Sequence, residues 1–157
     1  MQHTGYYENT GIGGEVNYFP EIRLEKLIQS IESGSRPQGG ASDLKDGIPS
    51  FGGEHITRDG TIVFDPPRFI PESYFNKMKR GQVQIDDILI VKDGATTGKT
   101  AIVTNNFPFE RAAINEHVFI IRLRKKFVLP AFMSYFLQSS FGQSQIMRSF
   151  QGAAIGG

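Results

Sequence analysis

The chain has 157 residues, which is enough for one domain with a sizeable core. It contains no cysteine, so a disulfide framework and a thiolate metal site are excluded. No apolar run reaches the roughly 20 residues that a membrane helix needs, and the N-terminus lacks the basic and then apolar pattern of a signal peptide. We therefore expect no membrane partner and a cytoplasmic location.

The charge is small overall but unevenly distributed. A formal net charge of +1 does not by itself indicate a nucleic-acid-binding protein. No acidic residue follows Glu116, however, whereas basic residues remain at Arg122, Arg124, Lys125, Lys126 and Arg148. Such an asymmetry suggests a side that faces a polyanion, although a basic run over residues 122–126 is also typical of a solvated strand end.

The N-terminal part is predicted to contain an arm and one helix. Residues 1–19, rich in Gly, Asn and Tyr, are expected to be a peripheral arm. A helix is predicted from Pro20, which suits a first helical turn, to Gly34, which suits a C-terminal end. Apolar residues repeat through this segment at helical spacing, namely Leu24, Leu27, Ile28 and Ile31. Residues 34–47 are predicted to be a loop.

Short strands are predicted to dominate the middle of the chain. Residues 48–51 favour an extended segment, and residues 55–64 favour a hairpin that turns at an Asp-Gly pair. Pro66-Pro67 ends that run. Further strands are predicted over 83–91, 99–104 and 113–124, with a short helix over 71–80.

Two helices are predicted at the end of the chain, over 130–138 and 142–150. The first has an apolar stripe that we expect to be buried, made of Phe132, Met133, Phe136 and Leu137. The order of one helix, many short strands and two helices predicts an α+β fold rather than alternating βαβ units.

Residues 88–100 resemble a nucleotide-binding P-loop, in which an apolar strand leads into a Gly-rich turn ending in Gly-Lys-Thr. A P-loop needs four residues between its first Gly and the Gly-Lys pair, because that length wraps backbone N–H groups around a phosphate. Here three residues separate Gly94 from Gly98. The β-branched residues after Lys99 also predict a strand where a P-loop opens a helix. We therefore predict two strands joined by a tight turn that carries Lys99.

No catalytic or metal-binding constellation can be assembled from the sequence. The histidines, His3, His55 and His117, lack ligand spacing, and we expect His117 to be a satisfied strand residue. Asp86-Asp87 could hold a metal, but its place before an apolar strand favours a polar turn. Residues 65–68 resemble the Asp-Pro-Pro-aromatic motif of adenine methyltransferases, with Arg in place of the aromatic residue and no cofactor-binding Gly motif elsewhere. We predict no catalytic residue, metal ligand or cofactor in this chain.

Several segments, taken in order, resemble a target-recognition domain of a type I restriction–modification specificity subunit. Residues 33–37 resemble the Ser-Gly-x-x-Pro element of that family, and residues 47–56 resemble its Ile-Pro strand. Residues 87–99 resemble its Gly-Asp-Ile-Leu and Asp-Gly-Ala-Thr-x-Gly-Lys signature, with Asp86 in place of the Gly. Residues 114–118 resemble its Asn-containing strand, and residues 130–157 its closing helical pair.

The resemblance covers residues 20–157 and implies a fold, a role and partners. It implies a single domain with a curved sheet of short strands, like that of DNA methylase specificity domains, that ends before the expected spacer helices. It implies that the chain reads one half-site of a double-stranded DNA sequence without catalysing a reaction. Separate modification subunits would methylate adenine with S-adenosylmethionine, and a restriction subunit would cleave with ATP and Mg²⁺. We expect the chain to be a fragment or an isolated domain.

The predicted DNA face consists of turns that carry basic and hydroxyl side chains, which can contact phosphates or base edges. Its residues are Arg36, His55, Thr57, Arg58, Arg68, Lys77, Lys79, Arg80, Lys92, Thr97 and Lys99.

Three other interpretations remain open at this level. The chain could be the recognition part of a single-chain restriction–modification enzyme, or a nucleotide-binding module that uses residues 94–100. It could also be a degenerate domain retained for protein interaction.

Overall fold

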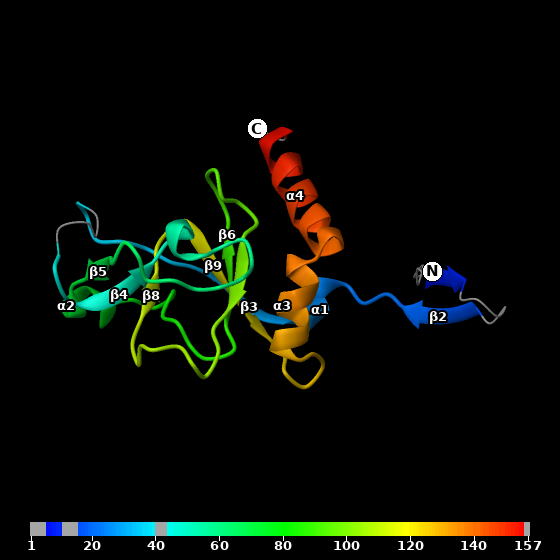
Figure 1. Cartoon of the computed structure of the whole chain (residues 1–157), viewed down its shortest axis with the longest axis horizontal. Helices are drawn as coiled ribbons and strands as arrows, with labels where there is room; N and C mark the ends of the chain where they lie inside the picture. Colours follow the sequence, from blue (N-terminus) through cyan, green and yellow to red (C-terminus); the bar gives the residue numbers. More distant parts are fainter. Residues whose placement is uncertain (1–5, 11–15, 40–43, 156–157) are drawn as a thin grey trace.

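The computed structural model describes residues 6–10, 16–39 and 44–155 (Figure 1). Its elements in chain order are β1 Tyr6–Thr10, β2 Val16–Pro20, α1 Leu24–Leu27, β3 Ile28–Ser33, β4 Ile48–Phe51, a 3₁₀ turn Gly53–His55, β5 Phe69–Ile70, α2 Glu72–Phe75, β6 Ile88–Val91, β7 Thr100–Ile102, β8 Ala113–Ile114, β9 Val118–Leu123, α3 Pro130–Gln138 and α4 Ser140–Ile155. The mixed α+β class agrees with the prediction from element order. The structure contains no helix that is long and apolar enough to cross a membrane among its described residues.

A four-stranded antiparallel sheet in the order β3-β9-β6-β7 forms the centre of the molecule. All four residues of β6 are buried. Leu89 and Val91 pack into a core with Phe51 and Ile120, whereas Ile88 and Ile90 pack into a second core that includes Met133 and Leu137 of α3. Because β6 is covered on both faces, its sequence is an uninterrupted apolar run rather than an alternating one.

A smaller sheet in the order β5-β4-β8 lies at the other end of the body from α3 and α4 (Figure 1). Within it β4 runs antiparallel to β5 and parallel to β8. Phe51 at the end of β4 meets the rings of Phe64, Phe107 and Phe109. The strands of the main body thus form two sheets with an aromatic core. The family resemblance instead predicts a single curved sheet.

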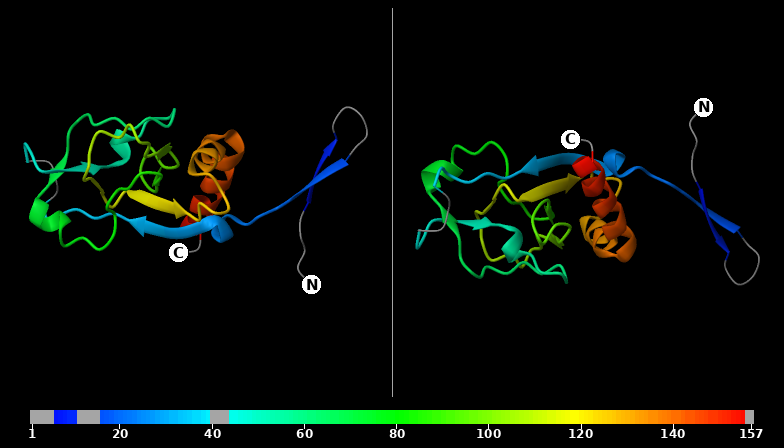
Figure 2. Two further views of the ribbon diagram at one scale, coloured as in Figure 1. Left: turned by 90° about the horizontal axis from the view of Figure 1, so that it is seen from below. Right: turned by 90° about the horizontal axis from the view of Figure 1, so that it is seen from above.

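The predicted helix over residues 20–34 is wrong. Only α1, a single turn, is helical, and β3 then pairs with β9 from Ile28↔Leu123 to Ser33↔Phe119 (Figure 2). β-Branched Ile28 and Ile31 suit a strand, and the partner strand β9 supplies the hydrogen bonds that a helix would otherwise make within itself. The predicted helix would have buried Ile31 as part of its apolar face, whereas Ile31 is 53% exposed in the strand.

Other predicted elements are present with different bounds. The strand over 113–124 is two strands, β8 and β9, which belong to different sheets. The strand over 83–91 begins only at Ile88, because a turn at Gln84–Asp87 precedes it, and the helix over 71–80 is the four-residue α2. In α3, which has the predicted bounds, Met133 and Leu137 are buried but Phe132 is 64% exposed, so half of the expected stripe faces solvent.

The N-terminal arm contains a two-stranded hairpin. Residues Tyr6–Thr10 pair antiparallel with Val16–Pro20, and the hairpin lies apart from the main body in the views of Figures 1 and 2. The prediction for residues 1–5 and 11–15 lies outside the described residues. The domain boundary at residue 20 stays a prediction.

A buried ionic group joins three strands of the central sheet. Arg122 on β9 donates from Nε to Asp87 Oδ1 at 2.8 Å and from Nη2 to the Gln82 carbonyl at 2.7 Å, and it also pairs through Nη1 with Glu32 on β3. The Asp87 side chain, directly before β6, is 2% exposed. Glu32 Oε2 accepts the Gly81 N–H at 2.9 Å, and Asp87 Oδ2 accepts the Gln84 N–H at 2.8 Å.

The environment shifts the pKa values of both central partners. Burial raises the pKa of the Asp87 carboxyl, against the hydrogen bonds from Arg122 and the Gln84 N–H, which lower it. Burial acts to lower the pKa of the Arg122 guanidinium, but hydrogen bonds and charges from Asp87 and Glu32 outweigh it and raise that pKa. Arg122 is therefore a permanent cation that compensates two carboxylates, one of them fully desolvated.

Replacing Arg122 with Met should destabilise the fold by about 3 kcal/mol, because the change leaves the buried Asp87 and the half-buried Glu32 without their cationic partner. The measurement is urea unfolding with the slope checked for two-state behaviour. Arg124→Met is the matched control. Arg124 is exposed, and its Nε donates to the Ile28 carbonyl, so a loss below about 1 kcal/mol is expected. Equal losses in the two variants would contradict a central role for the ionic group.

Candidate nucleic-acid interface

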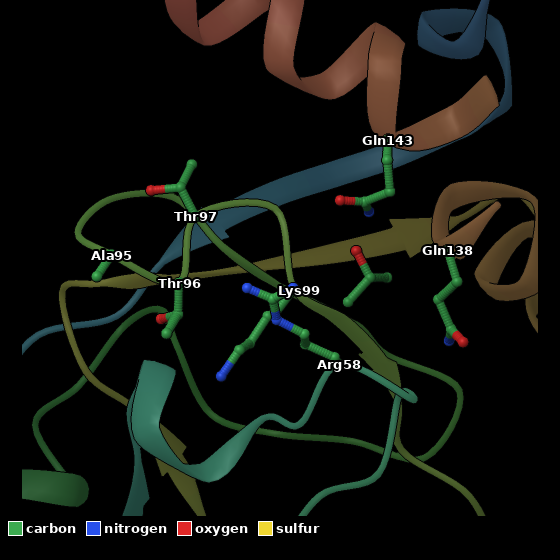
Figure 3. A pocket seen from close by; sticks show the side chains of 8 residues that line it. Arg58, Ala95, Thr96, Thr97, Lys99, Gln138 and Gln143 are labelled. Atoms are coloured by element: carbon green, nitrogen blue, oxygen red, sulfur yellow. The ribbon is translucent and has the colours of Figure 1, made fainter. Parts of the chain in front are cut away.

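Two turns and the α3–α4 junction enclose a hollow of about 290 Å³, which we call the turn hollow (Figure 3). Its lining residues are Arg58, Ala95, Thr96, Thr97, Lys99, Thr100, Gln138 and Gln143. Figure 3 shows Thr97 above Arg58 and Lys99 and Thr96 to one side of them, with Gln138 and Gln143 projecting from the helices. The turn hollow thus combines residues from three distant segments of the chain.

The turn between β6 and β7 shapes one wall. The Gly98 N–H donates to the Val91 carbonyl at 2.8 Å, and the Val91 N–H donates to the Lys99 carbonyl at 2.9 Å, so the turn closes directly on the strand pair. Gly94 and Gly98 have φ values of +83° and +89°, which favour glycine. Thr97 Oγ1 donates to the Gly94 carbonyl at 2.7 Å and stiffens the tip.

A second turn, residues 57–61, places Arg58. The Thr57 N–H donates to the Thr61 carbonyl at 3.0 Å, and Gly60 has a φ of +82°. The Thr57 hydroxyl donates to the Asp59 carboxylate, and this bond lowers the pKa of Asp59. Asp59 is thus turned toward its own loop, and it is absent from the lining of the turn hollow.

The two C-terminal helices hold both turns. Gln143 Nε2 donates to the Gly98 carbonyl and to the Leu137 carbonyl, each at 2.8 Å. A Cβ on Gly60 would lie 2.5 Å from Gln138 Nε2, so the Arg58 turn packs closely against the end of α3. The α3–α4 pair, predicted only as a helical end to the domain, therefore positions the candidate site.

The chemistry of the turn hollow suits an anion. No acidic residue lines it. Within the described part of the chain, neither Arg58 nor Lys99 forms an ion pair. Two uncompensated cations beside the Thr96 hydroxyl are the kinds of group with which proteins hold phosphate oxygens.

A second basic hollow lies beside α2. It is lined by Ser33, Gly34, Ser35, Tyr74, Lys77, Met78, Lys79 and Arg80, again without an acidic residue, and we call it the α2 hollow. Lys77, Lys79 and Arg80 have no ion pair among the described residues. The predicted face is therefore divided into two basic groups, one at each hollow.

His55 does not belong to this surface. The sequence places it among the DNA-facing residues, but the ring is buried in the core. Its Nδ1 accepts the Gly52 N–H at 2.8 Å, so Nε2 carries the proton and donates to the Pro66 carbonyl at 2.7 Å. Both ring nitrogens are occupied by backbone groups, which leaves His55 no atom for DNA.

The other residues predicted for the DNA face differ in how far their side chains are already engaged within the fold. Thr57 lies in the Arg58 turn with its hydroxyl engaged locally. Lys92 is half-buried: its Nζ lies 3.2 Å from Ser33 Oγ and 5.1 Å from the Phe119 ring centroid, which indicates a structural role. Arg68 pairs loosely with Glu54, with Nε 3.9 Å from Oε1.

A polar cluster that sequence reasoning missed surrounds Arg36. Arg36 Nε lies 2.6 Å from Glu116 Oε1, and His117 lies between Glu116 and Asp93. His117 lies exposed in the turn between β8 and β9, so its predicted place in a strand is wrong, although both ring nitrogens have a carboxylate partner. The cluster joins positions far apart in the sequence, and only the adjacency of Glu116 and His117 was visible beforehand.

The structure also bears on the P-loop and metal-site alternatives. Thr100 begins strand β7, not a helix, so the Gly94–Thr100 turn lacks the helix N-terminus of a P-loop, as predicted from its spacing. Asp86 pairs with Lys125, and Asp87 with Arg122. The described residues contain no group of three or more His, Cys, Asp or Glu side chains placed to hold a metal ion. His3 lies outside them.

Comparison with known proteins gives solved structures of similar fold. No protein-family model and no curated protein matches the sequence. The HsdS subunit from Thermoanaerobacter tengcongensis superposes with a TM-score of 0.55 and 16% sequence identity, over 80% of this chain and 28% of that chain. The chain thus spans less than a third of the length of that subunit. At this identity the likeness concerns the fold.

Replacing Gly98 with Ala should destabilise the protein by about 2 kcal/mol. A positive φ costs an L-residue about 1 kcal/mol, and the added Cβ would lie 2.9 Å from Gln143 Oε1, so relief requires breaking the Gln143 hydrogen bonds. Gly94→Ala is the matched control, because Gly94 has a similar φ but open space around it, and about 1 kcal/mol is expected. Thermal unfolding of both variants checks this. If Gly94→Ala were as destabilising, the clamp by Gln143 would not be supported.

Proposed function

We propose that this chain is a sequence-specific reader of double-stranded DNA that acts as the specificity component of a type I restriction–modification system, one domain reading one half-site. The observation that carries the proposal is the coincidence of an HsdS-like fold with two uncompensated basic hollows formed by turns of that fold. The HsdS subunit is a specificity subunit of such a system.

The placement of charge supports binding to a polyanion. The cations of both hollows stand on turns, where they can reach a neighbouring phosphate backbone, while the strands beneath provide a rigid support. The overall charge is near neutral because 17 Lys and Arg residues face 16 Asp and Glu residues. Several of the acidic side chains pair with cations outside the hollows, namely Arg36, Arg68, Arg111, Arg122 and Lys125. Five of the cations that form no ion pair among the described residues line the two hollows, namely Arg58, Lys77, Lys79, Arg80 and Lys99.

In this proposal the chain itself catalyses nothing. Modification subunits bind S-adenosylmethionine and methylate adenine, and a restriction subunit uses ATP and Mg²⁺ to cleave. The chain would contribute the choice of sequence, and it would work in the cytoplasm where the host DNA lies. A recognition segment of a single-chain restriction–modification enzyme would use the same surface, and the neighbouring coding sequence distinguishes the two.

The nucleotide-binding alternative loses its structural basis, because β7 follows the Gly-rich turn. Titration of ATP into the chain, followed by calorimetry, is expected to give no binding heat. Saturable binding in the micromolar range would revive that alternative and weaken the DNA proposal for Lys99.

Selection from a randomised duplex library tests the function directly. The chain is used with and without the modification subunits, and enrichment of a defined half-site is expected. Retention of the library without enrichment, at any salt concentration, would reject sequence-specific reading and favour a domain kept for protein interaction.

Lys99→Ala should weaken binding to all duplexes by a similar factor and reduce the slope of log K against log salt concentration by about 1. The cause is the loss of one cation from the turn hollow. Lys26→Ala is the control, since Lys26 is an exposed cation on α1 and lines neither hollow. Fluorescence anisotropy between low and moderate salt gives both slopes. A change in preference at one base pair, with the slope unchanged, would move Lys99 from phosphate contact to base reading.

A further inference from the structure

Arg36 differs from the other cations of the predicted DNA face in being tightly held. Its Nε lies 2.6 Å from Glu116 Oε1, whereas Arg68 is 3.9 Å from its partner and Arg58 has none among the described residues. The Arg36 side chain is nevertheless 54% exposed. The shortest contact is made by Nε. Among the described residues the terminal atoms Nη1 and Nη2 donate no hydrogen bond. Arg36 thus offers a fixed pair of donors at an exposed position.

A short chain of contacts fixes Glu116 in turn. His117 Nε2 lies 3.4 Å from the same Glu116 oxygen, and His117 Nδ1 lies 2.5 Å from Asp93 Oδ1. The backbone of His117 is also held, because its N–H donates to Asn115 Oδ1 and its carbonyl accepts the Lys92 N–H, each at 2.9 Å. Asp93, His117 and Glu116 therefore connect Arg36 to the turn between β6 and β7.

The backbone that carries Arg36 is equally constrained. A Cβ on Gly34 would lie 2.0 Å from the Ile114 carbonyl oxygen, so the chain passes directly over β8 at this point. The Tyr74 hydroxyl donates to Ser35 Oγ at 2.9 Å. Ser35, directly before Arg36, contacts α2, and Gly34 before it lies against the backbone of β8. These two contacts anchor the backbone at Arg36.

We propose that Arg36 reads a guanine in the major groove, and that Glu116, His117 and Asp93 are positioning residues that aim its guanidinium. The proposal rests on the proposed DNA-reading function. The two terminal nitrogens of a guanidinium match O6 and N7 of guanine. A guanidinium that is already oriented loses little side-chain freedom on binding.

The surroundings of Arg36 fit base reading better than phosphate binding. Its cluster has two carboxylates and an imidazole around one guanidinium, so it offers no net positive charge to a phosphate. It is linked by contacts to both basic hollows: Ser33–Ser35 line the α2 hollow, and Asp93 begins the turn whose far end carries Lys99. A reader between two phosphate-holding groups is the arrangement that direct readout requires.

The test measures discrimination at every position of the selected half-site. Duplexes with single base-pair changes are titrated against the wild-type chain and the Arg36→Ala variant in the complex used for the selection. Arg36→Ala is expected to lose roughly 10- to 100-fold of discrimination at one G·C pair, with other positions and the salt slope unchanged. Arg23→Ala, which removes an exposed arginine from outside both hollows, should change neither.

Glu116 supplies the test of positioning. Glu116→Ala should reduce discrimination at the same G·C pair, whereas Glu116→Gln, which keeps an acceptor oxygen, should restore part of it. Binding to an unrelated duplex should be unchanged in both. A role in folding alone would not single out that base pair.

Three outcomes would overturn the proposal. A uniform weakening by Arg36→Ala with a flatter salt slope would make Arg36 a phosphate contact and leave the proposed function intact. Full discrimination in Arg36→Ala would remove Arg36 from the reading set. Failure of the wild-type chain to select any sequence would reject the proposed function itself, and the role of Arg36 with it.

Discussion

The ion pairs of Arg122 hold together the framework on which everything else stands. One guanidinium ties β9 to β3 through Glu32, to the start of β6 through Asp87, and to the backbone of the segment 81–84 through Gln82. A buried carboxylate is tolerated only when its charge and its lone pairs are all satisfied. Asp87 meets that condition through Arg122 and the Gln84 N–H, and it thereby specifies where β6 begins.

The site follows from the strand that this group anchors. β6 is buried on both faces, and the chain can leave it only through a turn at the edge of the two cores. That turn carries Lys99 toward the helices and Asp93 toward Arg36. Gln143 then fixes the turn from the side of α4. The backbone that carries Lys99 is therefore held by hydrogen bonds both to β6 and to Gln143.

Sequence patterns predicted the local features well and the long-range ones poorly. The Gly94–Gly98 spacing and the β-branched residues after it correctly predicted two strands and a turn, because both signals act within a few residues. The segment 20–34 failed, since helical spacing of apolar residues competes with pairing to β9, a partner about 90 residues away. His55 failed for a related reason: a histidine between Glu54 and Ile56 gives no sign that the core will enclose it. The Arg36 cluster could not be foreseen, because its members come from three loops.

The exposed aromatic rings show that amino-acid composition does not predict which residues are buried. Phenylalanine was expected to supply the core, and Phe51 does so, but Phe132 lies mostly in solvent on α3. A residue count does not reveal which face of an element the remainder of the fold covers.

The hydrophobic clusters on the two faces of β6 are separate from the surface turns, and this separation has an evolutionary consequence. Arg36, Arg58 and Lys99 contribute nothing to either hydrophobic cluster. Exchange of these side chains would leave the strands and their packing intact. Under the proposed function, the target could therefore change through substitutions in a few loops, without loss of the fold that presents them.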